Sequence, residues 1–147
     1  MSKRNIVRFC KLPGQPPAKF ISKISWNTEL ANNAQLIANK CNMKAGDGVV
    51  VKLNSDKKVS QYNGEGTSVR SLVEPWFLEH KNYNYNENKC NGECKHYKQI
   101  VSADTEEIGC AVKKCSSKQI FVCNYYPGIQ DKKRPYEKGT KDSCIRK

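Results

Sequence analysis

The chain has 147 residues, eight of them cysteines, and a formal net charge of +12 at pH 7. This length suits one domain, and a mean hydropathy of -0.77 predicts a small apolar core. No stretch of the sequence approaches the ~20 apolar residues needed to span a bilayer. An even cysteine count without zinc-finger spacing predicts disulfides and therefore an extracellular, secreted protein. The charge favours anionic surfaces, but no nucleic-acid-binding motif accompanies it, so we expect no specific nucleic-acid partner.

The N-terminal part of the chain is predicted to be an irregular segment followed by a helix. Residues 1–20 contain Pro13-Gly14 and Pro16-Pro17, which interrupt regular structure. They show no apolar run typical of a signal peptide, so secretion is inferred from the cysteines. Residues 27–40 predict an amphipathic helix with Asn27 as its N-cap. Its apolar and small residues recur at steps of three and four: Leu30, Ala31, Ala34, Ile37, Ala38 and Cys41.

The middle of the chain contains weaker patterns. Gly46-Asp47-Gly48 predicts a turn, and Val49–Val51 a short strand or buried segment. Residues 54–66 are polar and contain glycine, so we expect an exposed loop there. A second helix is predicted over residues 67–82, with Pro75 causing either a kink or a new helix start. One face of that helix carries Val69, Leu72, Val73, Trp76 and Phe77.

The C-terminal part predicts a loop, a strand pair and a tail. Residues 82–91 are rich in asparagine and tyrosine and are expected to be irregular. Residues 107–113 and 119–125 alternate as strands do, and a short basic connection joins them. Residues 127–147 are interrupted by glycine and proline, which predicts an irregular tail. Since no repeat appears, residues 1–147 are predicted to form a single domain.

Short motifs in the second half of the chain resemble one known family. In chain order they are Trp76-Phe77-Leu78-Glu79, Cys94-Lys95-His96-Tyr97-Lys98-Gln99, Ile108-Gly109-Cys110-Ala111 and Phe121-Val122-Cys123-Asn124-Tyr125-Tyr126-Pro127-Gly128. This order resembles the CAP superfamily, named after the cysteine-rich secretory, antigen 5 and pathogenesis-related 1 proteins, here in a divergent and shortened form. The resemblance implies an α+β fold: an α/β/α sandwich in which helical layers enclose a small, mainly antiparallel sheet.

The resemblance also implies a cysteine pairing, whereas the spacing of eight cysteines leaves about 105 pairings open. The implied bridges hold the first helix to the sheet, cross the hairpin, close a small loop before His96 and join the chain ends. These bridges are Cys41–Cys115, Cys110–Cys123, Cys90–Cys94 and Cys10–Cys144.

In the family, two histidines and two glutamates converge in a cleft and can bind a divalent metal. The motifs of this chain supply Glu79 and His96, and Asp47 stands near the position of the second glutamate. The first histidine has no counterpart, since His80 adjoins Glu79 and points to another face of a helix. A metal, if bound, would use His96 and Glu79. Because a zinc site needs at least three ligands, we instead expect a hydrogen-bonded pair, no metal and no other cofactor.

Catalysis is not predicted. A cysteine nucleophile needs a free thiolate beside a histidine, and Cys94, two residues before His96, is expected to be bridged. No serine is marked out for a triad. An acid–base role for Glu79 and His96, as in a metal-dependent or hydrolytic enzyme, would require further groups to converge on them.

The hypothesis from these features is a secreted, non-catalytic protein that binds an extracellular or cell-surface protein. The family suggests a host receptor in immunity or haemostasis as the target. The alternative is a lipid carrier, with a sterol or fatty acid in a groove between the helix at 27–40 and the helix near Trp76. Exposed cations are either solubilising or candidate contacts to anionic partners such as sulfated glycans. These cations are Lys113, Lys114, Lys132, Lys133 and Arg134.

Overall fold

The computed structural model describes residues 12, 14–41, 48–66, 68–129 and 132–139. Its α-carbon contacts divide the chain into two compact units that alternate along the sequence. The first comprises Met1–Ser22, Phe77–Asp104 and Ile129–Lys147, and the second comprises Lys23–Trp76 and Thr105–Gly128. The single domain expected over residues 1–147 stays a prediction.

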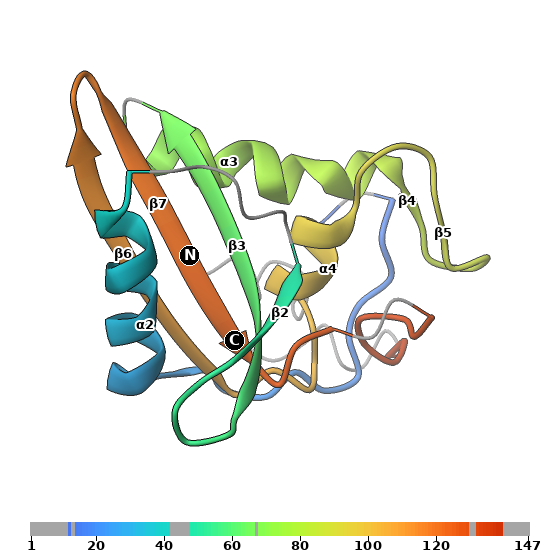
Figure 1. Ribbon diagram of the computed structural model, residues 1–147. Helices are drawn as coiled ribbons and strands as arrows, with labels where there is room; N and C mark the ends of the chain where they lie inside the picture. The colour runs from blue at the N-terminus through green and yellow to red at the C-terminus, as the bar shows by residue number, and fades with distance from the viewer. Residues whose placement is uncertain (1–11, 13, 42–47, 67, 130–131, 140–147) are drawn as a thin grey trace. The chain divides into compact units, whose positions relative to one another are not determined.

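The second unit is built on a mixed five-stranded sheet with the order β1-β6-β7-β3-β2. β1 pairs with β6 in parallel and all other pairs are antiparallel. The centre of the sheet is the predicted strand pair, which is confirmed and extended to a two-residue turn at Ser116-Ser117 (Figure 1). The strands are β1 (Ser25–Trp26), β2 (Val49–Lys52), β3 (Lys58–Gly66), β6 (Glu107–Cys115) and β7 (Lys118–Tyr126).

The first predicted helix is confirmed and covers one face of this sheet. α2 spans Thr28–Asn39, and the Asn27 side chain accepts a hydrogen bond from the Leu30 N–H at 3.1 Å. This bond satisfies one of the N–H groups that a helix start leaves without a partner. Small side chains let the helix pack closely on the sheet. The cluster consists of Ala34 and Ala38 from α2 with Ala111, Ile120 and Val122 from the strands.

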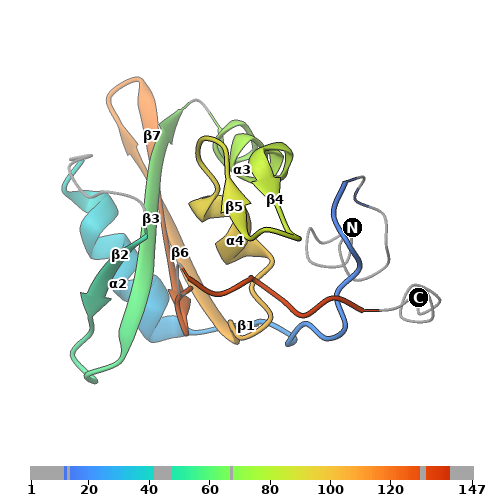
Figure 2. The same cartoon turned by 90° about the vertical axis from the view of Figure 1, so that its right-hand side faces the viewer.

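The opposite face of the sheet is covered by α3 (Val69–Leu78). The Trp76 ring lies 5.8 Å from the ring of Phe121 and 6.4 Å from that of Tyr62, measured between centroids. Phe121 alternates along β7 with Ile120 and Val122, which contact α2. α2 and α3 therefore lie on opposite sides of the sheet (Figures 1 and 2). The alternative hypothesis of a lipid carrier placed a groove between these two helices. In the described part of the chain the sheet separates them.

β3 corrects the expectation of an exposed loop over residues 54–66. It lies inside the sheet between β7 and β2, and its residues 59–63 are buried. The amide of Gln61 is satisfied internally: its Nε2 donates to Asn124 Oδ1 at 2.9 Å and to Asn33 Oδ1 at 3.2 Å. A polar strand buried in this way lacks the apolar alternation from which a strand is predicted.

Proline does not set the start of α3. The helix begins at Val69 and contains Pro75, so the alternative of a helix starting at Pro75 is wrong. The α-helix ends at Leu78, and the chain continues as the 3-10 helix η1 (Glu79–Asn82). The predicted helical stretch of residues 67–82 is thus two consecutive helices.

The first unit contains short elements around an aromatic core. They are η1, the two-stranded sheet of β4 (Tyr83–Asn84) and β5 (Lys89–Cys90), and α4 (Lys95–Ile100). The strands β4 and β5 lie within residues 82–91, which were expected to be irregular. The described part of the tail pairs with the N-terminal segment through a bridge between Ala18 and Lys138. Aromatic rings fill the core, including Phe77, Tyr83, Tyr85, Tyr97 and Tyr136.

Three disulfides stabilise the described residues: Cys41–Cys115, Cys90–Cys94 and Cys110–Cys123. These are pairs that the family resemblance implied. The fourth expected pair, Cys10–Cys144, lies outside the described residues. Within the described part of the chain, no helix is long and apolar enough to cross a membrane.

Candidate functional site

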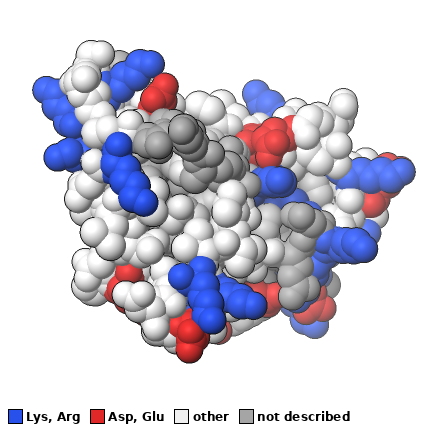
Figure 3. Space-filling view, in the orientation of Figure 1, with Lys and Arg blue, Asp and Glu red and all other residues white. Residues whose placement is uncertain are grey.

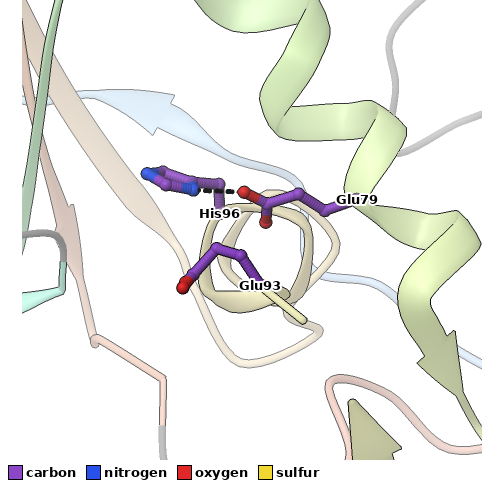
Figure 4. Close-up of side chains that lie close together, drawn as sticks. All are labelled: Glu79, Glu93 and His96. Carbon is purple, nitrogen blue, oxygen red and sulfur yellow. Dashed lines mark hydrogen bonds and ion pairs between the residues drawn. The ribbon is translucent and has the colours of Figure 1, made fainter. Parts of the chain in front are cut away.

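Glu79 and His96 come together where η1 meets α4. Glu79 is the first residue of η1, directly after α3, and His96 lies in the first turn of α4. The His96 Nδ1 atom lies 2.5 Å from Glu79 Oε2, and both side chains are nearly inaccessible, at 6% and 11% exposure. The two motifs singled out in the sequence therefore meet in one buried ion pair or hydrogen bond (Figure 4).

Both carboxylate oxygens of Glu79 are in use. While Oε2 contacts His96, Oε1 accepts a hydrogen bond from the backbone N–H of Tyr97 at 3.0 Å. The N–H groups in the first turn of a helix have no partner within the helix, and a negative charge there is favoured by the helix dipole. Glu79 thus fastens η1 to the start of α4.

Glu93 is a third member of the cluster, which the sequence motifs did not indicate. Each of Glu79, Glu93 and His96 offers one possible metal-ligand atom, and these three atoms lie within 4.8 Å of one another. Glu93 is exposed, and its Oε1 accepts from the backbone N–H of Lys95 at 3.3 Å. The Cys94 side chain at the N-cap of α4 makes no such bond. The two glutamates together therefore supply the acceptors that the helix start requires.

This donor set fits a divalent metal poorly. One imidazole and two carboxylates are donors that zinc accepts, but the oxygens of Glu79 already hold His96 and the Tyr97 N–H. Asp47 lies outside the described residues. His80 packs against the rings of Phe77 and Tyr97. Its pKa is lowered mainly by burial and to a smaller extent by the positive charge of Lys81.

The tyrosines of the first unit offer no general base at neutral pH. Burial raises the pKa of Tyr83 to about 12 and also raises the pKa of Tyr97 and Tyr136. The Tyr83 hydroxyl donates to Asn88 Oδ1 at 2.6 Å, and the Tyr85 hydroxyl donates to the Tyr136 carbonyl at 2.7 Å. These phenols remain protonated and serve packing.

We expect Glu79→Gln to lower the free energy of unfolding by about 1–2 kcal/mol, because the charge-assisted contact to His96 is lost. Glu93→Gln, at an exposed position, is the control and should change it by less than about 0.5 kcal/mol. Urea unfolding measures both values. Added Zn²⁺ should leave the unfolding midpoint unchanged; a rise that both variants remove would instead identify a metal site.

The basic residues from the sequence analysis fall into two sets. Lys113 and Lys114 are exposed at the end of the β6–β7 hairpin. In the first unit, Lys133 pairs with Asp104 at 2.7 Å, and Arg134 donates to the carbonyls of Tyr85 and Asn86 at 2.8 and 2.6 Å. Through these two hydrogen bonds Arg134 has a structural role. Lys132 is exposed, and all three basic residues line a hollow of about 680 Å³.

Known proteins show sequence and fold similarity to the chain. Residues 2–125 match the model of a family described as "CAP: Cysteine-rich secretory protein family". Mouse glioma pathogenesis-related protein 1 is 31% identical over 84% of the chain, and mouse GLIPR1-like protein 1 is 34% identical over 88%. The chain spans 51% and 59% of the length of these two relatives. The structure of Schistosoma mansoni venom allergen-like protein 4 superposes with a TM-score of 0.85 and 38% identity, covering 97% of this chain and 91% of that one.

Proposed function

The chain belongs to the cysteine-rich secretory protein (CAP) family, and on this basis we propose that it is a secreted, non-catalytic binding protein that acts on a protein at the surface of another cell. The observation that carries the proposal is the bonding of Glu79 to His96 and to the start of α4. Both side chains are nearly inaccessible, and both Glu79 oxygens accept hydrogen bonds from α4, which supports a structural role for the pair and leaves recognition to the exterior.

The covalent structure supports an extracellular location. The six cysteines of the described residues all form disulfides, which persist in oxidising compartments. These bridges stabilise a chain with a small apolar core and leave its exposed loops free to carry contacts. No observation favours a lipid carrier once α2 and α3 are placed on opposite faces of the sheet.

Binding to intact cells tests the proposal. We expect labelled protein to bind leukocytes, platelets or endothelial cells saturably at an ionic strength of about 0.15 M. Pretreating the cells with protease should abolish this binding, because the target is a protein. Denatured and reduced protein serves as the control for non-specific adhesion. Non-saturable binding that survives protease on every cell type would contradict the proposal.

A further inference from the structure

Exposed lysines gather at one end of the second unit. Lys113 and Lys114 end β6, Lys118 begins β7, and Lys40 is the C-cap residue of α2. All four are exposed, and they form what we call the hairpin-end cluster. Figure 3 shows basic side chains gathered at the upper left, where Figure 1 places the end of the β6–β7 hairpin.

The hairpin-end cluster is held on a rigid base. The turn between β6 and β7 has two residues, and the disulfide Cys41–Cys115 fastens the end of α2 to the end of β6. In the register of the hairpin, Lys113 pairs with Ile120 and Cys115 pairs with Lys118. Lys113 and Lys118 are therefore diagonal neighbours on the face that α2 covers, with their α-carbons ~7–8 Å apart. The backbone that carries these lysines is fixed in this way, so a ligand has to order only their side chains.

Negative charge at the hairpin-end cluster is sparse. Among the described residues, its one ion pair joins Lys118 to Glu65 at 3.2 Å, with side-chain exposures of 60% and 42%. Such an exposed pair contributes little and is screened by salt. Neighbouring like charges repel each other, and a ligand that carries closely spaced negative groups would relieve that repulsion.

We propose that the hairpin-end cluster binds sulfated glycan chains. A linear polyanion fits lysines that are separate and exposed. Val112, the exposed apolar residue before Lys113, is not an aromatic ring on which bases could stack, and one valine is too small to insert into a bilayer. The inference adds a second ligand to the proposed function, because a secreted protein would meet sulfated glycans at the surface of its target cell.

Affinity for immobilised heparin tests this inference with two variants of equal net charge. Lys113→Gln/Lys114→Gln removes two charges from the hairpin-end cluster, and Lys89→Gln/Lys95→Gln removes two exposed charges from the first unit. Each lysine beside a polyanion contributes about 5-fold to the binding affinity, so the first variant should bind heparin about 25-fold more weakly than the wild type. The second should bind nearly as well as the wild type. Circular dichroism checks that both variants are folded.

Two results would overturn the inference. Equal weakening by both variants would show that net charge alone determines retention. Tighter lysine-dependent binding to phosphatidylserine vesicles than to heparin would make a membrane the partner. Loss of binding to desulfated heparin would support the role of sulfate. Heparinase treatment of the cells removes the glycan but not the protein target. Cell binding that persists after this treatment would therefore support the protein target independently of the glycan.

Discussion

A Gly109→Ala chain is expected to lose about 3 kcal/mol or more of its free energy of unfolding, measured by urea denaturation. A methyl group at Gly109 would overlap the backbone nitrogen of Ala31 and would lie 2.6 Å from the Cβ atom of Leu30. Both obstacles belong to α2, and a backbone atom cannot move aside as a flexible side chain can. The helix would have to lift from the sheet, which would disrupt its packing on Ala111 and Val122.

Gly14→Ala provides the matched control for this effect. No atom lies within 4 Å of the added methyl group, and only the backbone angle φ of +83° opposes the change. A cost of about 1 kcal/mol is expected from that angle. Comparable losses in the two variants would contradict the close contact between α2 and the sheet at Gly109.

Removing the Cys41–Cys115 disulfide with a Cys41→Ser/Cys115→Ser double variant is expected to cost about 4 kcal/mol. The bridge joins residues 74 apart in sequence, so it restricts the unfolded chain strongly. The Cys90–Cys94 bridge closes a separation of 4 residues, and its removal should cost about 2 kcal/mol.

Urea unfolding of the two double variants measures this difference. The larger loss should come from the long-range bridge. The same variant should also bind heparin more weakly, because the end of α2 that carries Lys40 is no longer joined to the end of β6. A greater loss of stability from the short bridge would contradict the role assigned to Cys41–Cys115 in fastening α2 to the sheet.

Periodic apolar patterns made part of this fold predictable. Leu30, Ala34 and Ala38 recur on one face and marked α2 to within a residue of its bounds. β3 could not be found in this way, because Gln61 and Asn63 are buried and polar. The hydrogen bonds of Gln61 go to Asn33 and Asn124, which lie far away in sequence. α4 has six residues, too few to show a helical period.

Only those residues of the candidate site that belong to the sequence motifs could be predicted. The motifs supplied Glu79 and His96, and the structure joins them. The partners that decide their role are the Tyr97 N–H and Glu93, which no motif contains. An acidic residue just before a short helix is a weak signal for Glu93. The bond to Tyr97 depends on how η1 meets α4, which local sequence does not specify.

Cell binding by the Glu79→Gln variant tests most directly whether recognition depends on the exterior of the protein and not on the buried pair. The variant should remain folded, since its expected loss is about 1–2 kcal/mol. Its saturable, protease-sensitive binding to cells should match that of the wild type. A folded Glu79→Gln protein that no longer binds cells would contradict a purely structural role for Glu79 and His96.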